Sequence, residues 1–282
     1  MLKRRIISRL DIKGPNLVKG VNLEGLRVLG NPSEFAKYYY ETGADEILLM
    51  DCVASLYGRN SLYNIISYAA ENTFVPITVG GGIRTLNDIN RILRSGADKV
   101  CINTAGINNP NFIKEAVEHF GSSTIVSSVE VILNDSGDYL CYTDNGREYT
   151  GIEMNTWINK VQDLGVGEIL LTSVDKEGTG EGFDLNLINN LKTDVEIPII
   201  YHGGIGNMND VLKLMKEYNF DGVALASSLH YHYISQFESN PSDREGNTNF
   251  IQEKRSFNGI EPFEINHLKR FLSNEKLAIR LL

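Results

Sequence analysis

The sequence predicts a (β/α)8 TIM barrel of the α/β class, which occupies residues 1–282 as a single domain. Two observations support this prediction. Eight short apolar runs alternate with segments whose apolar residues recur at helical spacing, a pattern typical of a parallel sheet covered by helices. The second half of the chain also repeats segments of the first half in the same order. A closed barrel built from two similar halves accounts for both observations.

The strand candidates are short runs rich in Ile, Val and Leu. They span residues 5–12, 46–51, 75–80, 99–103, 124–130, 168–173, 197–202 and 222–227. Helices are expected between them, and several end at a Gly that suits a helix C-cap. These helical segments span 32–43, 61–71, 86–96, 111–121, 156–165, 185–192 and 208–218, and a last helix is expected at 264–274.

The internal repeat strengthens the barrel prediction. The stretch "GADEILLMD" recurs as "GVGEILLTS", and "VGGGIRT" recurs as "YHGGIGN", both 122 residues later (168 − 46 and 204 − 82). The stretch "DKVCINT" recurs as "DGVALAS", 123 residues later (221 − 98). Chance rarely repeats three separate segments in order at nearly one offset. A half-barrel repeat also predicts paired sites across the mouth of the barrel.

Two segments interrupt the alternation of strands and helices. Residues 131–151 contain Ser-Gly-Asp and Asp-Asn-Gly, which are turn sequences, and predict a hairpin insert. Residues 235–262 are polar and rich in turn formers, and they form an insertion between the eighth strand and the last helix. A connection of this length in a compact domain is either functional or mobile.

Composition excludes several classes of function. The net charge of −9 predicts no broad attraction to nucleic acid or to an anionic membrane. Cys52, Cys101 and Cys141 form no CxxC pair, which suits a reducing cytoplasm and argues against a structural zinc or a disulfide scaffold. The basic N-terminus has too short an apolar run for a signal peptide or a membrane span. We read His230 and His232 as ordinary polar residues and expect neither a metal nor a cofactor.

In such barrels the chemistry lies at the carboxyl ends of the strands. Glycine-rich strand ends followed by helix starts expose several backbone N–H groups, which favour an anion. The repeat supplies this arrangement twice, so the sequence predicts a substrate with two phosphates held on opposite sides of the mouth. The first set is Gly81, Gly82, Asn103 and Thr104, and the second is Gly203, Gly204, Ser227 and Ser228.

Two carboxylates on opposite halves of the barrel predict acid–base catalysis. Asp11 and Glu130 stand at the ends of the first and fifth strands, between the two predicted phosphate sites. Lys19, just after the first strand, is a candidate for substrate binding, and Thr172 stands at the end of the sixth strand. Alternatively, the carboxylates form caps or salt bridges and Lys19 is a surface residue.

Four ionisable residues stand at the starts of strands, at the opposite end of the barrel. Charges at this end usually contribute to stability. In the other interpretation, two cations and two anions on strands 1, 2, 4 and 6 form a gate across the barrel floor. The four residues are Arg5, Glu46, Lys99 and Glu168.

The motifs together resemble the cyclase subunit of imidazole glycerol phosphate synthase. The resemblance rests on "RRIISRLDIKGPNLVKG", "GADEILLMDCVAS", "PITVGGGIRT", "GADKVCINTAGINNP", "GEILLTSVDKEGT", "GGIGNM" and "ALASSLHYH", and it covers nearly the whole chain except 235–262. It implies a barrel that receives ammonia from a glutaminase partner docked at its N-terminal face. The ammonia then reacts at the mouth with a bisphosphorylated ribonucleotide, in a lyase reaction of histidine biosynthesis that yields imidazole glycerol phosphate.

The resemblance also implies roles for single residues. Asp11 matches the first catalytic aspartate, and Lys19 matches a substrate-binding lysine. Arg5, Glu46, Lys99 and Glu168 match an ammonia gate. The phosphate sites match Gly82, Asn103 and Thr104 on one side, and Gly178, Gly204, Ser227 and Ser228 on the other.

Departures from the family pattern gather at the mouth. Glu130 and Glu177 each stand where the family has an Asp, and His202 stands where a small serine is usual. The stretch "GPN" at 14–16 replaces Asp-Gly-Arg, and the insertion 235–262 lies beside the second phosphate site. One extra methylene moves a carboxylate by about 1 Å, and misplacement of that order can cost ~10²-fold in rate.

These departures leave an alternative function open. Cyclase-like relatives in surface-polysaccharide synthesis channel ammonia to a sugar amidotransferase that makes acetamidino sugars, and this role fits an intact gate with an altered mouth. A third candidate is the related two-phosphate isomerase barrel of histidine biosynthesis. That isomerase needs no gate, so the four charged residues at the barrel floor count against it.

Overall fold

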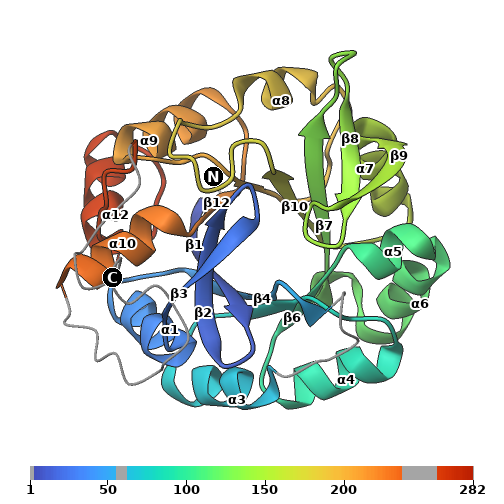
Figure 1. Cartoon of the computed structure of the whole chain (residues 1–282), viewed down its shortest axis with the longest axis horizontal. Coiled ribbons are helices and arrows are strands. Elements are labelled where there is room, and N and C mark those ends of the chain that lie inside the picture. The colour runs from blue at the N-terminus through green and yellow to red at the C-terminus, as the bar shows by residue number, and fades with distance from the viewer. Residues whose placement is uncertain (1–2, 55–61, 237–258, 282) are drawn as a thin grey trace.

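A computed structural model gives the fold, and it describes residues 3–54, 62–236 and 259–281. Eight parallel strands among the described residues close into a barrel, and helices surround them (Figure 1). The order around the barrel is β1, β4, β5, β6, β7, β10, β11, β12, and β12 pairs with β1 again. The predicted (β/α)8 TIM barrel is therefore confirmed.

The strands of the barrel follow the predicted apolar runs closely. They are β1 Arg5–Lys13, β4 Glu46–Asp51, β5 Ile77–Gly80, β6 Lys99–Ile102, β7 Ile125–Leu133, β10 Glu168–Ser173, β11 Ile199–His202 and β12 Gly222–Leu225. The predicted strands 75–80 and 197–202 begin two residues later than expected. Pro76 and Pro198 explain this difference, because proline has no N–H to donate to a neighbouring strand.

Helices cover the outside of the barrel. They are α1 Pro32–Glu41, α3 Tyr63–Asn72, α4 Leu86–Arg94, α5 Thr104–Asn108, α6 Pro110–Phe120, α7 Met154–Asp163, α8 Leu185–Asn190, α9 Met208–Glu217, α10 Ser227–Gln236 and α12 Ile265–Asn274, with a 3-10 turn at Ser122–Thr124. Thr85 and Asn207 begin α4 and α9 with capping boxes closed by Asp88 and Asp210. These two caps follow the two repeated glycine motifs, so the repeat extends to the way each helix starts.

The strand boundaries reproduce the internal repeat. Strands β4 and β10 start 122 residues apart (168 − 46), as do β5 and β11 (199 − 77), while β6 and β12 start 123 apart (222 − 99). Strands β1 and β7 start 120 residues apart and have equal length (125 − 5). Each half of the barrel therefore consists of four strands in the same order.

Each half also carries an antiparallel excursion after its first strand. In the second half, β7 continues to Leu133 and pairs with β8 Tyr139–Thr143, which pairs with β9 Glu148–Glu153. This region overlaps the hairpin that we expected at 131–151. In the first half, β1 pairs with β2 Asn16–Val21, which pairs with β3 Glu24–Gly30, a hairpin that the sequence analysis missed.

Side chains in the barrel interior form layers. An apolar layer near the middle consists of Ile7, Leu48, Met50, Cys101, Val126, Leu170, Ile200 and Ala224. Charged residues lie on both sides of this layer, toward the strand starts and toward the strand ends. The larger apolar core lies between the outer faces of the strands and the helices, where Leu10, Leu49 and Leu171 are fully buried. Such a two-sided burial pattern is expected of a parallel barrel.

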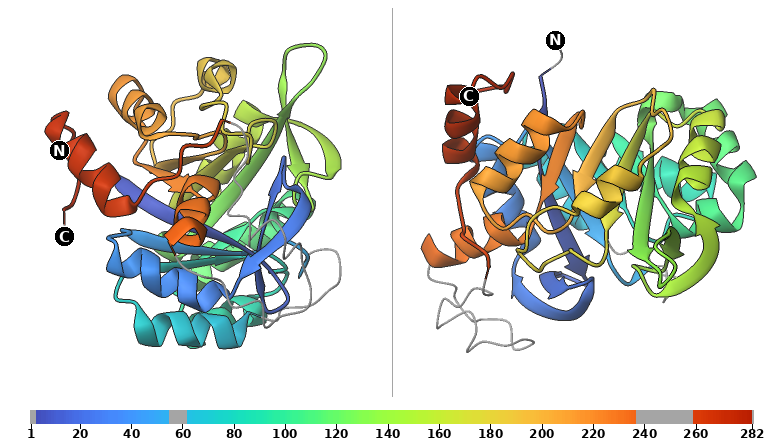
Figure 2. Two further views of the ribbon diagram at one scale, coloured as in Figure 1. Left: turned by 60° about the vertical axis from the view of Figure 1, so that its left-hand side comes forward. Right: turned by 90° about the horizontal axis from the view of Figure 1, so that it is seen from above.

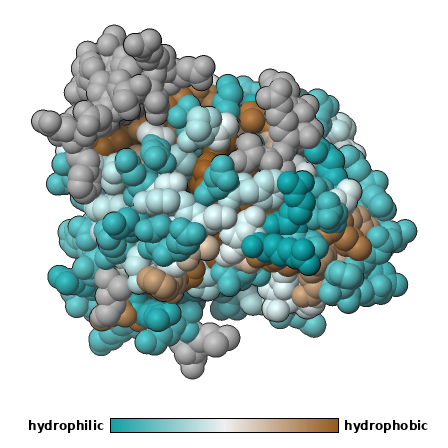
Figure 3. All heavy atoms as spheres, turned by 90° about the horizontal axis from the view of Figure 1, so that it is seen from below, coloured by the Kyte–Doolittle hydropathy of each residue, from teal (hydrophilic) through white to brown (hydrophobic). Residues whose placement is uncertain are grey.

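Arg4, just before β1, forms a parallel bridge with Ile279, which follows α12 (Figure 2). The N–H of Arg4 donates a 3.0 Å hydrogen bond to the carbonyl of Ala278. Hydrophilic residues cover most of the face drawn in Figure 3, and hydrophobic residues lie there in small separate groups, as on ordinary water-exposed surface. No helix within the described ranges is long and apolar enough to cross a lipid bilayer. Most of the expected insertion at 235–262 lies outside the described residues.

Candidate active site

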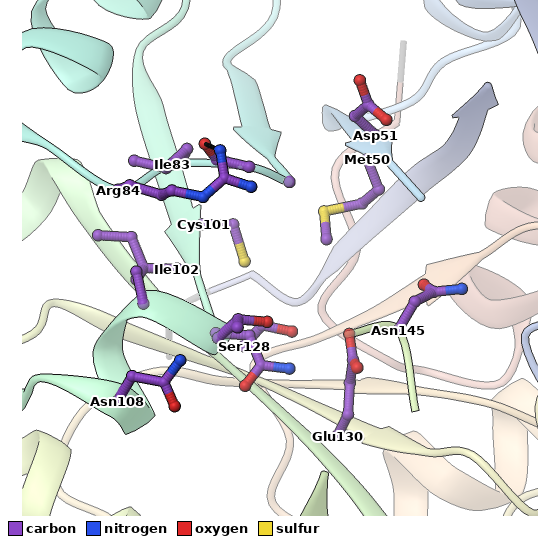
Figure 4. Close-up of a pocket in the computed structure, with 15 residues that line it drawn as sticks. Met50, Asp51, Ile83, Arg84, Cys101, Ile102, Asn108, Ser128, Glu130 and Asn145 are labelled. Carbon is purple, nitrogen blue, oxygen red and sulfur yellow. Dashed lines mark hydrogen bonds between the residues drawn. The ribbon is translucent and has the colours of Figure 1, made fainter. Parts of the chain in front are cut away.

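A cavity of about 270 Å³, called here the mouth cavity, opens at the carboxyl ends of β4, β5, β6 and β7 (Figure 4). Both carboxylate and amide side chains reach it, together with the sulfur atoms of a Met and a Cys. Its lining includes Met50, Asp51, Gly81, Gly82, Arg84, Cys101, Asn103, Thr104, Ser128, Glu130 and Asn145. The first predicted phosphate set and one predicted catalytic carboxylate therefore share one cavity.

The glycines of "VGGGIRT" bring the backbone to the edge of this cavity. Gly81 and Gly82 have φ of +96° and +68°, in the left-handed region that favours glycine. A Cβ on Gly81 would lie 2.3 Å from the carbonyl oxygen of Asp51. A Cβ on Gly80 would lie 2.5 Å from the sulfur of Met50. The carbonyl of Asp51 thus requires glycine at 81, whereas a side chain at 80 would displace the flexible end of Met50.

Glu130 lies on the inward face of β7, at the wall of the mouth cavity, and is buried. Its Oε2 accepts a 3.0 Å hydrogen bond from the N–H of Gly146, in the turn between β8 and β9. Burial raises the pKa of Glu130 to about 7, although Arg9 and the Gly146 N–H act in the opposite direction. A carboxyl group that titrates near neutral pH can both donate and accept a proton.

Asn103 and Thr104 lie where β6 passes into α5. The Nδ2 of Asn103 donates to the carbonyl of Tyr142 at 3.1 Å, and the hydroxyl of Thr104 accepts from the N–H of Asp144 at 3.1 Å. These bonds fix the β8–β9 excursion over the cavity. The Oδ1 of Asn103 is buried without a hydrogen-bond partner, which leaves it available to a donor group of a ligand.

Asp11 lies in a buried network of charged side chains next to the mouth cavity. The Nε of Arg9 donates to Oδ1 of Asp11 at 2.8 Å, and Nη1 of Arg9 lies 3.1 Å from Nδ1 of His202. The ammonium group of Lys19 lies 3.7 Å from Oδ2 of Asp11 and binds Oε1 of Glu177. Each of these five side chains is at most 3% exposed.

This network fixes the charges of its members. Burial would raise the pKa of Asp11, but Arg9 and Lys19 hold that pKa well below its ordinary value. Burial opposes the charge of Arg9, but Asp11 and Glu177 raise its pKa above the ordinary value. Burial and the neighbouring Arg9 lower the pKa of His202, which is therefore neutral. Asp11 is a permanent carboxylate, whereas Glu130 titrates near neutrality.

The second predicted phosphate site is much smaller than the first. Glu177, Gly178, His202, Gly203, Gly204, Ala224 and Ser227 are among the residues that line a cavity of about 20 Å³ there. The N–H of Gly182 donates to the carbonyl of Gly204 at 2.8 Å, so the loop after β10 packs directly against the glycine turn. The hydroxyl of Ser228 donates to the carbonyl of Ile205. The two halves thus have similar backbone structure, but their cavities differ in volume, about 270 Å³ against about 20 Å³.

Thr172 lies on the inward face of β10, next to Glu130 in strand register. It is fully buried, and its hydroxyl has no hydrogen-bond partner. Thr172 lines neither of the two mouth-side cavities described above. Within the described ranges, no group of three or more His, Cys, Asp and Glu side chains is placed to hold a metal ion.

The four charged residues at the strand starts form a closed cycle, called here the basal ring. Arg5 binds Glu46 at 3.0 Å and also binds Glu168. Lys99 binds Glu46 and Glu168, each at 2.9 Å. Thr78 adds a hydrogen bond of 2.5 Å from its hydroxyl to Oε1 of Glu46. Each cation contacts both anions, so the basal ring closes the lumen at the end opposite the mouth cavity.

Arg9 was not predicted as a residue of the site. The signal was present in "RIISRLDI", because residues 5, 7, 9 and 11 of a strand share one face. Arg5 and Asp11 were both expected to face the lumen, which places Arg9 there as well. A buried Arg inside a barrel needs carboxylate partners, and Asp11 is the nearest one in sequence.

Comparisons with known proteins agree with this architecture. The family model described as "Histidine biosynthesis protein" matches residues 5–235. A protein of Legionella pneumophila named imidazole glycerol phosphate synthase subunit HisF is 54% identical over 206 residues, which are 73% of this chain and 97% of that protein. Proteins of the same name from Lactococcus lactis subsp. cremoris (strain SK11) and Streptococcus mutans are 45% and 40% identical. The aligned regions cover 82% and 87% of this chain, and 90% and 98% of those proteins. The resemblance predicted from the motifs is therefore confirmed, and the chain belongs to the histidine biosynthesis protein family that includes these imidazole glycerol phosphate synthase subunits.

Proposed function

We propose that this protein is the ammonia-dependent cyclase subunit of an imidazole glycerol phosphate synthase in histidine biosynthesis. The observation that supports the proposal best is the pairing of the basal ring with the mouth cavity, at opposite ends of one lumen. Charges at a barrel floor can serve stability alone, but a closed ring opposite the mouth cavity also suits a gate for ammonia. Relatives that are 40–54% identical carry the name of this synthase subunit.

In this proposal the substrate is a bisphosphorylated ribonucleotide bound across the mouth. One phosphate lies beside Gly81 and Gly82, with Asn103 and Thr104 on the other side of the mouth cavity. The other phosphate occupies the smaller site, which Gly178, Gly203, Gly204, Ser227 and Ser228 would form. A site of about 20 Å³ has to widen by movement of the loop after β10 before it can accept a phosphate.

The two carboxylates then have different tasks. Glu130 is the acid–base group, because its pKa lies where the group can gain and lose a proton at neutral pH. Asp11 stays ionised and, rather than taking a proton, holds the cations Arg9 and Lys19 on the opposite side of the mouth. Lys19 and Glu177 lie beside Asp11 and orient the same side of the substrate. Thr172 provides a hydroxyl beside Glu130, on the neighbouring strand β10.

A glutaminase subunit is the partner in this proposal, and it docks at the strand-start face. Its product, ammonia, enters through the basal ring of Arg5, Glu46, Lys99 and Glu168 and leaves at the mouth. The reaction needs no metal or cofactor in this scheme, because ammonia is the nucleophile and the protein supplies the proton transfers. The proposed location is the cytoplasm.

One assay tests the proposed function directly. The purified protein is given the bisphosphorylated ribonucleotide and excess ammonium, and the formation of imidazole glycerol phosphate is followed. We expect turnover by the wild-type protein and loss of most turnover in Glu130→Gln. An unreactive wild-type protein that still binds the ribonucleotide would contradict the cyclase function.

One observation favours a second function, that of an ammonia-channelling subunit for a sugar amidotransferase. Lys19 binds Glu177 and lies close to Asp11, and the neighbouring second site has a volume of only about 20 Å³. An ammonia-channelling subunit requires the basal ring but does not require a second phosphate site at the mouth. Binding of the ribonucleotide separates the two, because the channelling subunit has no need to bind it.

A further inference from the structure

A second cavity lies inside the barrel, directly above the basal ring, and is called here the inner cavity. Its volume is about 10 Å³, which is about the space needed for one water-sized molecule. The side chains of Glu46, Thr78 and Glu168 line its floor. Apolar side chains line the rest, namely Ile7, Leu48, Val126, Leu170 and Ile200, together with Cys101.

Cys101 separates the inner cavity from the mouth cavity. Among the described residues it is the one that lines both. Its side chain is 2% exposed, and Figure 4 shows its sulfur pointing toward the middle of the mouth cavity. An added Cβ at Gly80 would lie 2.5 Å from the sulfur of Met50 and 3.1 Å from Cβ of Cys101. The partition is therefore tightly packed around Gly80, and the side chain of Cys101 contacts the cavity on each side of it.

The other half of the lumen is closed by Arg9. Its side chain extends from β1 toward the mouth, where Nε meets Asp11 and Nη1 meets His202 of β11. Arg9 is fully buried and lines neither the inner cavity nor the mouth cavity. A small molecule that leaves the inner cavity on this side meets a fixed cation and a network of hydrogen bonds. On the Cys101 side it meets a single neutral thiol.

We propose that the ammonia route is off-centre: ammonia passes from the inner cavity along the thiol of Cys101 into the mouth cavity below Glu130, while Arg9 closes the opposite half. This inference rests on the proposed use of ammonia from a glutaminase partner. It identifies Cys101 as the constriction of the route. It also states where ammonia arrives, on the side of the mouth that contains Glu130 and the larger cavity.

The chemistry of a thiol suits this position. Burial raises the pKa of Cys101 to about 12, so the thiol is neutral at physiological pH. A neutral thiol is a weak hydrogen-bond donor and acceptor, so ammonia passes it without being held. Above its floor the inner cavity has apolar walls, and removing an ammonium ion from water costs far more than removing neutral ammonia. The route therefore admits ammonia and disfavours ammonium.

A size series at Cys101 tests the route. The complex with its glutaminase partner is assayed with glutamine, and then with excess ammonium, which reaches the mouth cavity from solvent. We expect Cys101→Leu to lower the ratio of glutamine-driven to ammonium-driven turnover by at least ~10-fold, the effect of ~1.4 kcal/mol of added barrier. Cys101→Ala should keep the wild-type ratio. Because the measurement is a ratio, a general loss of folded protein cancels.

The matched control is Cys141→Leu, the same exchange at a buried thiol of β8 that packs in the outer core. It should leave the ratio unchanged. A ratio in Cys101→Leu equal to that of the wild type would overturn the off-centre route while leaving the cyclase function intact. A ratio that changes only in Arg9→Met would place the route on the opposite half and would also overturn it. A wild-type protein that fails with both nitrogen sources would reject the proposed function itself, and the route with it.

Discussion

Nε of Arg9 donates a 2.8 Å hydrogen bond to Oδ1 of Asp11 in the barrel lumen, where both side chains are shielded from solvent. This contact separates the roles of the two predicted catalytic carboxylates. Asp11 has two cations within 4 Å, Arg9 and Lys19, and stays ionised. Glu130 lies across the lumen with a backbone N–H as its hydrogen-bond donor and a pKa of about 7. The half-barrel repeat places Asp11 and Glu130 at similar positions, and their different neighbours shift their pKa values in opposite directions.

Asp11→Asn should destabilise the fold at neutral pH, because it leaves Arg9 buried without its carboxylate. Breaking a buried ion pair by removing one partner costs about 3–5 kcal/mol in the free energy of unfolding. The pKa of Asp11 is depressed in the folded state, so its stabilisation is present above the ordinary pKa of Asp. The difference between variant and wild type should therefore shrink as the pH falls below about 4.

Urea denaturation of Asp11→Asn at pH 7 and at pH 3 measures this difference. Glu41→Gln is the control, because Glu41 pairs with Lys37 on the surface of α1, where both side chains are more than half exposed. That variant should change the free energy of unfolding by less than about 0.5 kcal/mol. Equal effects of the two substitutions at pH 7 would refute a stabilising role for the Arg9–Asp11 pair.

Glu130→Gln should stabilise the protein at alkaline pH. Burial raises the pKa of Glu130 from 4.5 to about 7, so ionisation of this group costs stability as the pH rises from about 4.5 to 7. Gln cannot ionise and keeps an acceptor for the Gly146 N–H. The stability of the variant relative to wild type should therefore increase by ~3 kcal/mol between pH 4 and pH 8, at 1.36 kcal/mol per pKa unit. Thermal or urea unfolding at both pH values measures it, and a pH-independent difference would contradict the raised pKa.

The barrel could be predicted because both patterns that indicate it, the alternation of strands with helices and the internal repeat, can be read from consecutive residues. Both patterns correspond directly to elements of the folded protein. The eight strands were predicted correctly for this reason. The four charged residues at the strand starts form ion pairs with one another, and their role as an ammonia gate stays a prediction. The hairpin of β2 and β3 was missed because it has no apolar alternation clear enough to separate it from a loop.

The interior of the mouth was predicted less well, since it depends on contacts between strands far apart in sequence. The equal appearance of the two glycine motifs suggested two equal phosphate sites, but their cavities measure about 270 and 20 Å³. The second cavity is smaller because the loop that contains Gly182 packs on Gly204. This contact joins residues 22 positions apart (204 − 182) and cannot be predicted from either motif alone. Arg9 was overlooked because it lies within β1 and not at a strand end, although its position in the alternation places it in the lumen.

Gly81→Ala should destabilise the protein much more than Gly137→Ala. Both glycines have a positive φ, +96° and +88°, so Ala is strained at each, by about 1–2 kcal/mol. At Gly137 nothing lies within 4 Å of the added Cβ, whereas at Gly81 the Cβ would meet the carbonyl oxygen of Asp51 at 2.3 Å. The excess cost of Gly81→Ala in urea denaturation therefore measures the close approach of β5 to β4. Similar costs at the two positions would show that the turn conformation alone requires glycine at 81.

Lys99→Ala should lower glutamine-driven turnover and leave ammonium-driven turnover nearly unchanged. Lys99 binds both Glu46 and Glu168, so its loss leaves two carboxylates with Arg5 as their remaining partner in the basal ring. The floor of the lumen then carries an excess negative charge, which attracts ammonium and water and lets ammonia escape. Glutamine-driven turnover should fall about tenfold or more. Ammonium-driven turnover should stay within about twofold of wild type, since the mouth cavity lies at the other end of the lumen.

Steady-state assays of the complex with glutamine and with ammonium measure both rates for Lys99→Ala. Lys216→Ala is the matched control, because Lys216 forms a surface ion pair with Glu275 outside the lumen and both side chains are more than 40% exposed. The control should leave both rates at the wild-type level. An equal fall of both rates in Lys99→Ala would mean that the basal ring stabilises the barrel without controlling the passage of ammonia. A fall of the glutamine-driven rate alone, absent from the control, is the result that a gate requires.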